Sequence, residues 1–221
     1  MLIVANLKAN SFQFSGYRPA DNDSVEVAMA APFPLILKIE KPFVRAAQDV
    51  SAFEPGAYTG EVPARLLADL SVRYVLVGHS ERRRYLGENT ALVEKKIERA
   101  AEVGIVPIIC AQNPDEIPAN IRNFSVEKYL ITYEPFSAIS TEGNYHPENP
   151  ERVVATIADW KRKLPAGVRL LYGGSINAEN ISGFLSADGA GTIFGFVIGH
   201  AALEGESLSA IINQCHGQNS H

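Results

Sequence analysis

Short runs of apolar residues recur along the chain and are separated by longer amphipathic or polar stretches. Eight such runs are present, at residues 2–5, 25–31, 43–47, 74–77, 105–110, 129–133, 168–172 and 194–198. They lack the strict alternation of apolar and polar residues that marks a strand with one solvent-exposed face, so they are typical of strands buried on both faces. The pattern therefore predicts eight strands of a parallel sheet with helical connections between several of them.

Two of the connections carry a clear helical pattern. Residues 88–104 place their apolar side chains on one face and end at Gly104, which suits a helix terminus. Residues 150–164 begin with Pro150, have a periodic apolar face and finish in a basic last turn. We expect a helix in each of these two stretches.

Two other connections look incomplete. Residues 11–24 contain a glycine, a proline and a polar turn cluster without a convincing apolar face. The stretch after residue 110 carries Pro114 and Pro118 and leaves room for little more than a short helix. We expect the first helix and the connection after the fifth strand to be shortened or missing.

Eight strands with mostly helical connections predict a single (β/α)8 barrel, the TIM barrel, over residues 1–215. Residues 216–221 are expected to form a frayed tail. An open doubly wound sheet is the alternative fold. The segment after the first run, "VANLKAN", contains no glycine, so the glycine fingerprint of a dinucleotide site is absent and the alternative is less favoured.

Composition and charge exclude several classes of function. The chain has 221 residues, 46% of them hydrophobic, and a net charge of -5, which argues against a general nucleic-acid binder. The first apolar run is too short for a signal peptide and no run approaches a membrane span, so we expect a cytoplasmic protein without membrane contact. Cys110 and Cys215 are expected to be reduced thiols, and no zinc-binding spacing is present.

Polar residues follow the apolar runs at the points where the strands would end. In a barrel these ends converge on one mouth, which would gather Asn6, Lys8, Gln48, His79, Ser80, Glu81, Glu134, Ser175 and Gly199. Each has an ordinary explanation by itself, such as a solvated lysine, a helix cap or the end of a strand. Together, a base, a hydrogen-bond donor and a lysine are the set that removes a proton beside a carbonyl and holds the resulting oxyanion.

The last two predicted strands are followed by small residues. "YGGS" and "VIGHAA" follow these strands, at residues 172–175 and 197–202. Backbone N–H groups and a helix start at these positions can hold a phosphate group. A pair of glycines is a weak signal alone, but its place after the seventh strand strengthens it.

Five segments in this order, "ANLKAN", "GAYTGE", "VGHSERR", "TYEPFSAIST" and "YGGSIN", closely resemble the successive motifs of the triosephosphate isomerase family. The resemblance spans almost the whole chain. It implies a cofactor-free isomerase that interconverts D-glyceraldehyde 3-phosphate and dihydroxyacetone phosphate through an enediolate, as part of glycolysis and gluconeogenesis.

The resemblance also implies the roles of individual residues. Glu134 would be the base that moves a proton between the two carbons, and His79 would polarise the carbonyl. The dipole of the helix beginning at Ser80 would keep the His79 imidazole neutral. Lys8, with Asn6 beside it, would hold the substrate and stabilise the developing negative charge.

Other residues would support this site. Glu81 would be a buried partner that orders Lys8, and Arg82 would brace the neighbouring loop and a subunit contact. Residues 135–141 would form a lid over the phosphate. The backbone N–H groups expected to bind the phosphate are those of Ser140, Ser175, Gly199 and His200.

The segment 53–61 resembles the loop that reaches from one subunit into its partner, with Thr59 at the inserting position. A homodimer follows as an expectation, with a tetramer as the larger assembly to consider. An ordinary surface turn containing glycine is the alternative interpretation of this segment.

Three residues depart from the family pattern. Ser137 stands where the lid usually carries a tryptophan, Ser140 replaces a glycine, and His200 takes the second position of a Gly-Gly pair. If the backbone at His200 needs a positive φ, the strain is about 1–3 kcal/mol. In the favoured interpretation the N–H of His200 binds the phosphate and the ring points away. In the two alternatives the ring adds a hydrogen-bond donor to the phosphate, or it obstructs the pocket.

Two other functions stay open at this point. A catalytically impaired relative would act as a phosphate-binding or protein-interaction module, and the three departures are its support. Another barrel enzyme acting on a phosphorylated sugar would share the phosphate site.

Overall fold

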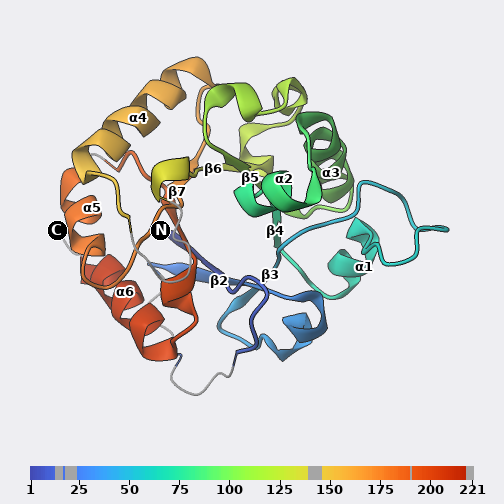
Figure 1. Cartoon of the computed structure of the whole chain (residues 1–221), viewed down its shortest axis with the longest axis horizontal. Helices are drawn as coiled ribbons and strands as arrows, with labels where there is room; N and C mark the ends of the chain where they lie inside the picture. The colour runs from blue at the N-terminus through green and yellow to red at the C-terminus, as the bar shows by residue number, and fades with distance from the viewer. Residues whose placement is uncertain (13–16, 18–23, 139–145, 190, 218–221) are drawn as a thin grey trace.

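Eight parallel strands close into a barrel at the centre of the molecule (Figure 1). The computed structural model describes residues 1–12, 17, 24–138, 146–189 and 191–217. Each strand pairs with the next along the chain, and the last pairs with the first. The strands are β1 (Leu2–Asn6), β2 (Glu26–Ala31), β3 (Val44–Ala47), β4 (Tyr74–Val77), β5 (Val106–Ala111), β6 (Leu130–Tyr133), β7 (Leu170–Tyr172) and β8 (Gly195–Ile198). Every strand overlaps one of the eight apolar runs, so the predicted TIM barrel is confirmed.

Helices surround the barrel in the view of Figure 1. They are α1 (Ala64–Asp69), α2 (Ser80–Leu86), α3 (Thr90–Glu102), α4 (Pro150–Lys163), α5 (Ile181–Ala187) and α6 (Gly205–Gly217). The two helices predicted from periodicity are α3 and α4. Each begins at an asparagine cap, because the side chains of Asn89 and Asn149 accept hydrogen bonds from the third following N–H, at 2.9 Å in both cases.

The connections expected to be incomplete contain no α-helix among the residues described. Between β1 and β2, the described residues 7–12, 17, 24 and 25 lie outside helices. After β5 the chain forms three short 3₁₀ helices, η2 (Pro114–Glu116), η3 (Ala119–Asn123) and η4 (Val126–Lys128). A proline begins η2 and another precedes η3, which agrees with the expected effect of Pro114 and Pro118. Other 3₁₀ segments follow β2, β6 and β8: η1 (Phe33–Lys38), η5 (Phe136–Ala138) and η6 (His200–Ala202).

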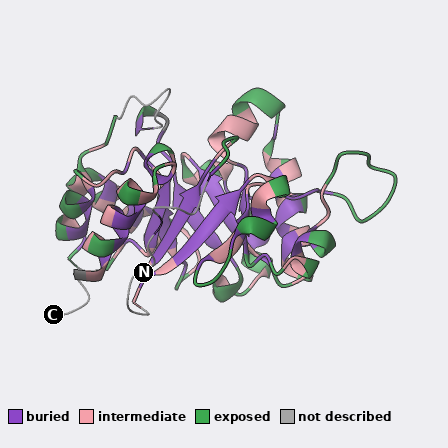
Figure 2. Cartoon of the chain, turned by 90° about the horizontal axis from the view of Figure 1, so that it is seen from below, coloured by how far each residue is buried: buried purple, intermediate pink, exposed green. Residues whose placement is uncertain are grey.

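Both faces of the strands are buried, as Figure 2 shows. Along β1, Leu2 and Val4 belong to one apolar cluster, whereas Ile3 and Ala5 belong to the larger cluster that the helices cover. This explains the lack of alternation in the sequence. A Cβ atom at Gly195 would lie 2.0 Å from the carbonyl oxygen of Leu2, so the pairing of β8 with β1 requires glycine there.

The carboxyl-terminal helix is longer than expected. Helix α6 continues through His216 and Gly217, the first two residues of the predicted tail, and residues 218–221 lie outside the described part. His216 Nδ1 lies 2.7 Å from Ser24 Oγ, so the last turn of α6 contacts the segment before β2. Cys110 and Cys215 are buried and free. No helix among the described residues is both long and apolar enough to cross a membrane.

Candidate active site

The strand ends on one side of the barrel surround a pocket. Its walls are formed by Asn6, Lys8, His79, Ser80, Glu134, Ala138, Gly173, Gly174, Ser175, Val197 and Gly199. The structure therefore brings together the three predicted catalytic residues and three of the predicted substrate-binding residues. Ala138 of η5 and Val197 of β8 also line the pocket; both lie in segments predicted to border the phosphate, but an apolar side chain carries no chemical signal that singles it out.

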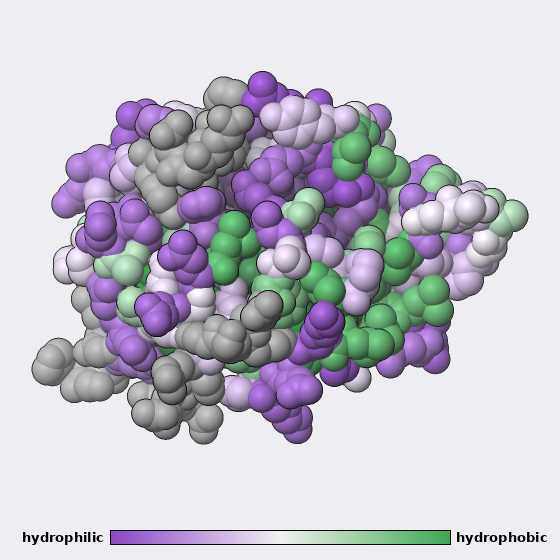
Figure 3. Space-filling model, turned by 60° about the horizontal axis from the view of Figure 1, so that its bottom comes forward, coloured by the Kyte–Doolittle hydropathy of each residue, from purple (hydrophilic) through white to green (hydrophobic). Residues whose placement is uncertain are grey.

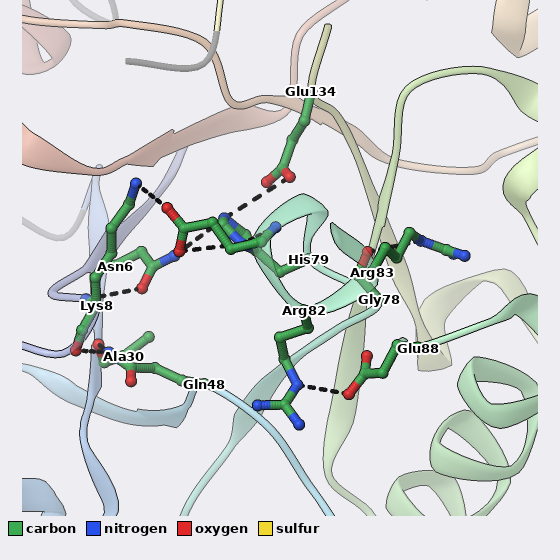
Figure 4. Close-up of polar contacts among 11 residues, drawn as sticks. Asn6, Lys8, Ala30, Gln48, Gly78, His79, Arg82, Arg83, Glu88 and Glu134 are labelled. Atoms are coloured by element: carbon green, nitrogen blue, oxygen red, sulfur yellow. Dashed lines mark hydrogen bonds and ion pairs between the residues drawn. The ribbon is translucent and has the colours of Figure 1, made fainter. Parts of the chain in front are cut away.

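Glu134 follows β6 and is 3% exposed. Its backbone N–H donates to the carbonyl oxygen of Ala111 at 2.9 Å, and its side chain points toward His79 (Figure 4). Burial raises the pKa of Glu134, while His79, a hydrogen bond from Cys110 and the charge of Lys8 oppose the rise. The carboxylate is therefore a stronger base than an ordinary glutamate.

His79 caps helix α2. The N–H of Glu81 donates to Nδ1 of the ring at 3.3 Å, so Nδ1 acts as an acceptor. In a neutral imidazole that accepts this bond the proton resides on Nε2, and the nearby Asn6 Nδ2, itself a donor, then makes no hydrogen bond with Nε2. Nε2 faces the pocket, 3.9 Å from Oε2 of Glu134 and 3.4 Å from Nδ2 of Asn6. The ring is placed to donate a hydrogen bond to a substrate oxygen.

Lys8 has a backbone φ of 49°, which is uncommon for a residue with a side chain. A conformation of this kind costs about 1–3 kcal/mol and persists only where the surroundings enforce it. Asn6 Oδ1 accepts from the N–H of Lys8 at 3.1 Å, and Gln48 Nε2 donates to its carbonyl oxygen at 2.8 Å. Gln48 also donates to Ala30 at 2.8 Å, so it links the Lys8 turn to β2.

Lys8 and Glu81 form the expected ion pair, with Nζ 2.5 Å from Oε1. The expectation that Glu81 is buried is wrong for the single chain, because 37% of its side chain is exposed. Glu81 lies in the first turn of α2. It also borders a second hollow beside the pocket, which leaves it open to solvent on that side.

Arg82 lies at the centre of a largely buried charge cluster. Its guanidinium contacts Asp49 at 2.6 Å and Glu88 at 2.5 Å. Lys96 on α3 lies 2.6 Å from Asp49 and also contacts Glu88, so the cluster joins α2, α3 and the segment after β3. Burial disfavours ionisation of Glu88, but hydrogen bonds from Lys96 and Arg82 outweigh it and hold the pKa of Glu88 below its ordinary value. Nothing in the sequence marks Lys96 as buried, because a lysine in a helix is usually solvated.

On the opposite wall, Ser175 has a φ of 47°. Its hydroxyl donates to the carbonyl oxygen of Ala138 at 2.7 Å and accepts from the N–H of His146 at 3.2 Å. A Cβ at Gly174 would lie 2.5 Å from the hydroxyl of Tyr172, so this close approach requires glycine. Ser140 lies outside the described residues.

His200 begins η6 at the end of β8 and is exposed. Among the described residues, a positive φ outside glycine occurs at Lys8, Ser71 and Ser175. The strain considered for His200 is therefore not present. Thr59 is exposed on the loop after β3 and lies apart from the pocket of its own chain. No three His, Cys, Asp or Glu side chains of the described residues are grouped closely enough to hold a metal ion.

A family model for triosephosphate isomerase matches residues 1–215, almost the whole chain and all eight strands. The chain belongs to the triosephosphate isomerase family. It is 40% identical to triosephosphate isomerase of Thermus thermophilus over 215 residues, covering 85% of this chain and 84% of the relative. Triosephosphate isomerases of Coxiella burnetii (strain Dugway 5J108-111; 35% identity, covering 88% of this chain and 86% of the relative) and Corynebacterium diphtheriae (33%, covering 86% and 83%) are also similar.

Proposed function

We propose that this triosephosphate isomerase family member interconverts D-glyceraldehyde 3-phosphate and dihydroxyacetone phosphate, with separate roles for Glu134, His79 and Lys8. Glu134 takes a proton from the carbon beside the carbonyl and returns it to the neighbouring carbon. His79 donates a hydrogen bond from Nε2 to the oxygen that becomes negative, and the ammonium of Lys8 stabilises the enediolate. The observation that carries this proposal is a buried glutamate facing an imidazole Nε2 at 3.9 Å across a pocket that Lys8 also lines.

The other wall suits the phosphate group. We assign the phosphate to backbone N–H groups of Ser175, Gly199 and His200, together with Ser140. A Cβ at Gly199 would meet Cε of Lys8 at 3.5 Å, so the lysine stem lies against this part of the wall. The exposed position of His200 supports the interpretation in which its N–H faces the phosphate and its ring points away.

The test is steady-state isomerisation of glyceraldehyde 3-phosphate by the purified protein, with Glu134→Gln as the matched variant. Loss of a positioned base lowers turnover by about 10²- to 10⁴-fold. Wild-type turnover no faster than that of the variant, from folded protein, would instead support an impaired relative.

We also propose that two copies of the chain form the active assembly. Large apolar side chains are exposed at Phe33, Leu37, Phe53, Tyr58, Leu66, Tyr85 and Leu86. The loop that contains residues 53–61 protrudes beyond the barrel (Figures 1 and 2), and the rings of Phe53 and Tyr58 stack at 4.2 Å on it. Figure 3 shows hydrophobic side chains on the half of one face that carries the protrusion.

The second hollow beside the pocket is the proposed receptor for this loop. Lys8, Glu81, Arg82, Tyr85 and Leu86 contribute to its walls. A loop from the second copy, with Thr59 at its tip, would cover this hollow and remove Glu81 from solvent. The exposed side chains of Tyr85 and Leu86 would thereby be buried.

Sedimentation equilibrium tests the assembly. Wild type is expected at the mass of a dimer, and Leu86→Glu is expected to shift the protein toward the monomer because it places a charge in the contact. A monomeric wild type would contradict the assembly, and a mass of four chains would indicate a tetramer.

The family's reaction belongs to glycolysis and gluconeogenesis, and we propose the cytoplasm as its location.

A further inference from the structure

The segment that carries Glu134 is held from both sides by one carboxylate. Glu148 Oε1 accepts a hydrogen bond from the hydroxyl of Ser137 at 2.8 Å. Its other oxygen, Oε2, accepts a longer hydrogen bond from the hydroxyl of Tyr133 at 3.4 Å. Tyr133 precedes Glu134 directly, and Ser137 follows it by three residues. The two hydroxyls therefore bracket the residue assigned as the base.

Glu148 is itself well placed to act as a fixed point. It directly precedes Asn149, whose side chain caps α4 by accepting from the N–H of Arg152 at 2.9 Å. The Tyr133 ring packs against Trp160 of the same helix, with centroids 5.1 Å apart. The contact thus connects the end of β6 to the start of α4.

The chemistry of the two donors suits an ionised carboxylate. Burial and the nearby Glu148 charge raise the pKa of Tyr133 to about 12, so its hydroxyl remains protonated at neutral pH. Serine hydroxyls also keep their proton there. A carboxylate can accept on both oxygens at once, whereas a glutamine carboxamide offers one acceptor oxygen.

One oxygen of the Glu134 carboxylate, Oε2, has no hydrogen-bond partner among the described residues. The direction of this side chain therefore depends on its packing and on the backbone that carries it. The backbone around Glu134 is bonded from Glu134 to Ala111, from Gly173 to Tyr133 and, within η5, from Ala138 to Pro135, each at 2.9 Å. A contact outside the pocket that fixes this backbone would therefore help to orient the Glu134 carboxylate.

We propose that Glu148 is a positioning residue that fixes the backbone from Tyr133 to Ser137 and so orients Glu134. This inference rests on the proposed role of Glu134 as the base. Ser137 stands where the family's lid usually carries a tryptophan, so in this chain the hydrogen bond to Glu148 comes from a serine hydroxyl.

Kinetics of Glu148→Ala, Ser137→Ala and the double variant test the inference. Because a displacement of about 1 Å at a reacting group costs about 10²-fold, we expect Glu148→Ala to lower kcat by about 10-fold with KM within about twofold of wild type. Ser137→Ala is expected to lower kcat less and to add little in the double variant, since both changes remove the same contact. Glu148→Gln, which keeps one acceptor, should recover part of the loss.

Glu151→Ala is the matched control, because Glu151 is an exposed carboxylate three residues further on, in the first turn of α4. Its kcat is expected to equal that of wild type. A kcat for Glu148→Ala within twofold of wild type, or fully additive losses in the double variant, would overturn the inference.

Hydrogen exchange separates this inference from the proposed function, because it needs no activity. In a peptide covering residues 133–138, Glu148→Ala should speed amide exchange by about 10-fold or more relative to wild type and to Glu151→Ala. Unchanged exchange overturns the positioning role whether or not the wild type is active. If the wild type were inactive but the variant exchanged faster, the proposed isomerase activity would be rejected and the positioning role of Glu148 would stand.

Discussion

Gly173 offers a sharp test of how closely the base is held. It lies directly after β7, and its N–H donates to the carbonyl oxygen of Tyr133 at 2.9 Å. A Cβ atom added there would lie 3.0 Å from Cγ of Glu134, 3.1 Å from Oγ1 of Thr132 and 3.2 Å from Oε1 of Glu134. Carbon atoms in contact normally stay about 3.5–4.0 Å apart, so Gly173→Ala requires the Glu134 side chain to move by about 0.5 Å or more.

The expected effect on catalysis follows from this displacement. A misplacement of about 1 Å costs about 10²-fold in rate, so half of it predicts a loss of about 10-fold in kcat. That loss corresponds to about 1.4 kcal/mol in the activation barrier. The assay is steady-state isomerisation of glyceraldehyde 3-phosphate, with thermal unfolding measured in parallel to show that the barrel is intact.

Gly189→Ala is the matched control, because among the described residues beyond its chain neighbours its added Cβ would meet only the carbonyl oxygen of Ser186, at 3.9 Å. Its kcat should equal that of wild type. If Gly173→Ala also retained wild-type kcat, the side chain of Glu134 would have room to move without consequence. The close packing of the base against β7 would then have no part in catalysis.

Two further predictions concern stability. Lys96→Ala removes a buried ion-pair partner from the carboxylates of Asp49 and Glu88, so we expect it to lower the free energy of unfolding by about 3–5 kcal/mol. Lys95 is exposed, and Lys95→Ala should change that free energy by no more than about 0.5 kcal/mol. Urea denaturation measures both values. Burial raises the pKa of Glu134 above the value of about 4.3 in the unfolded chain, so its ionisation costs stability as pH rises. Urea denaturation of Glu134→Gln and wild type should give equal stability near pH 4 and a more stable variant near pH 8; a less stable variant at pH 8 would contradict the burial cost.

The barrel was predictable because its strands are buried on both faces, which leaves unbroken apolar runs in the sequence. The convergence of Asn6, Lys8, His79 and Glu134 followed from the same reasoning, since parallel strands end on one side of the barrel. The two well-formed helices also carry their signals locally, in their asparagine caps and apolar periodicity.

The features that escaped prediction depend on contacts between distant segments. Lys96 resembles a solvated helix position until Asp49 and Glu88 are seen beside it. The positive φ of Lys8 is imposed by Asn6 and by Gln48 from after β3, which no local pattern encodes. Burial of Glu81 was expected from the family resemblance, but the single chain leaves it partly exposed.

In the proposed reaction Glu134 moves a proton between two carbons of a triose phosphate. The most direct measurement follows the isomerisation of glyceraldehyde 3-phosphate in D₂O by proton NMR, because a carboxylic acid exchanges its proton with solvent while the enediolate is bound. We expect deuterium at the transferred carbon position in wild-type product, formed at a rate that Glu134→Gln lowers by about 10²- to 10⁴-fold. Deuterium incorporation by Glu134→Gln at the wild-type rate would show that another group is the base.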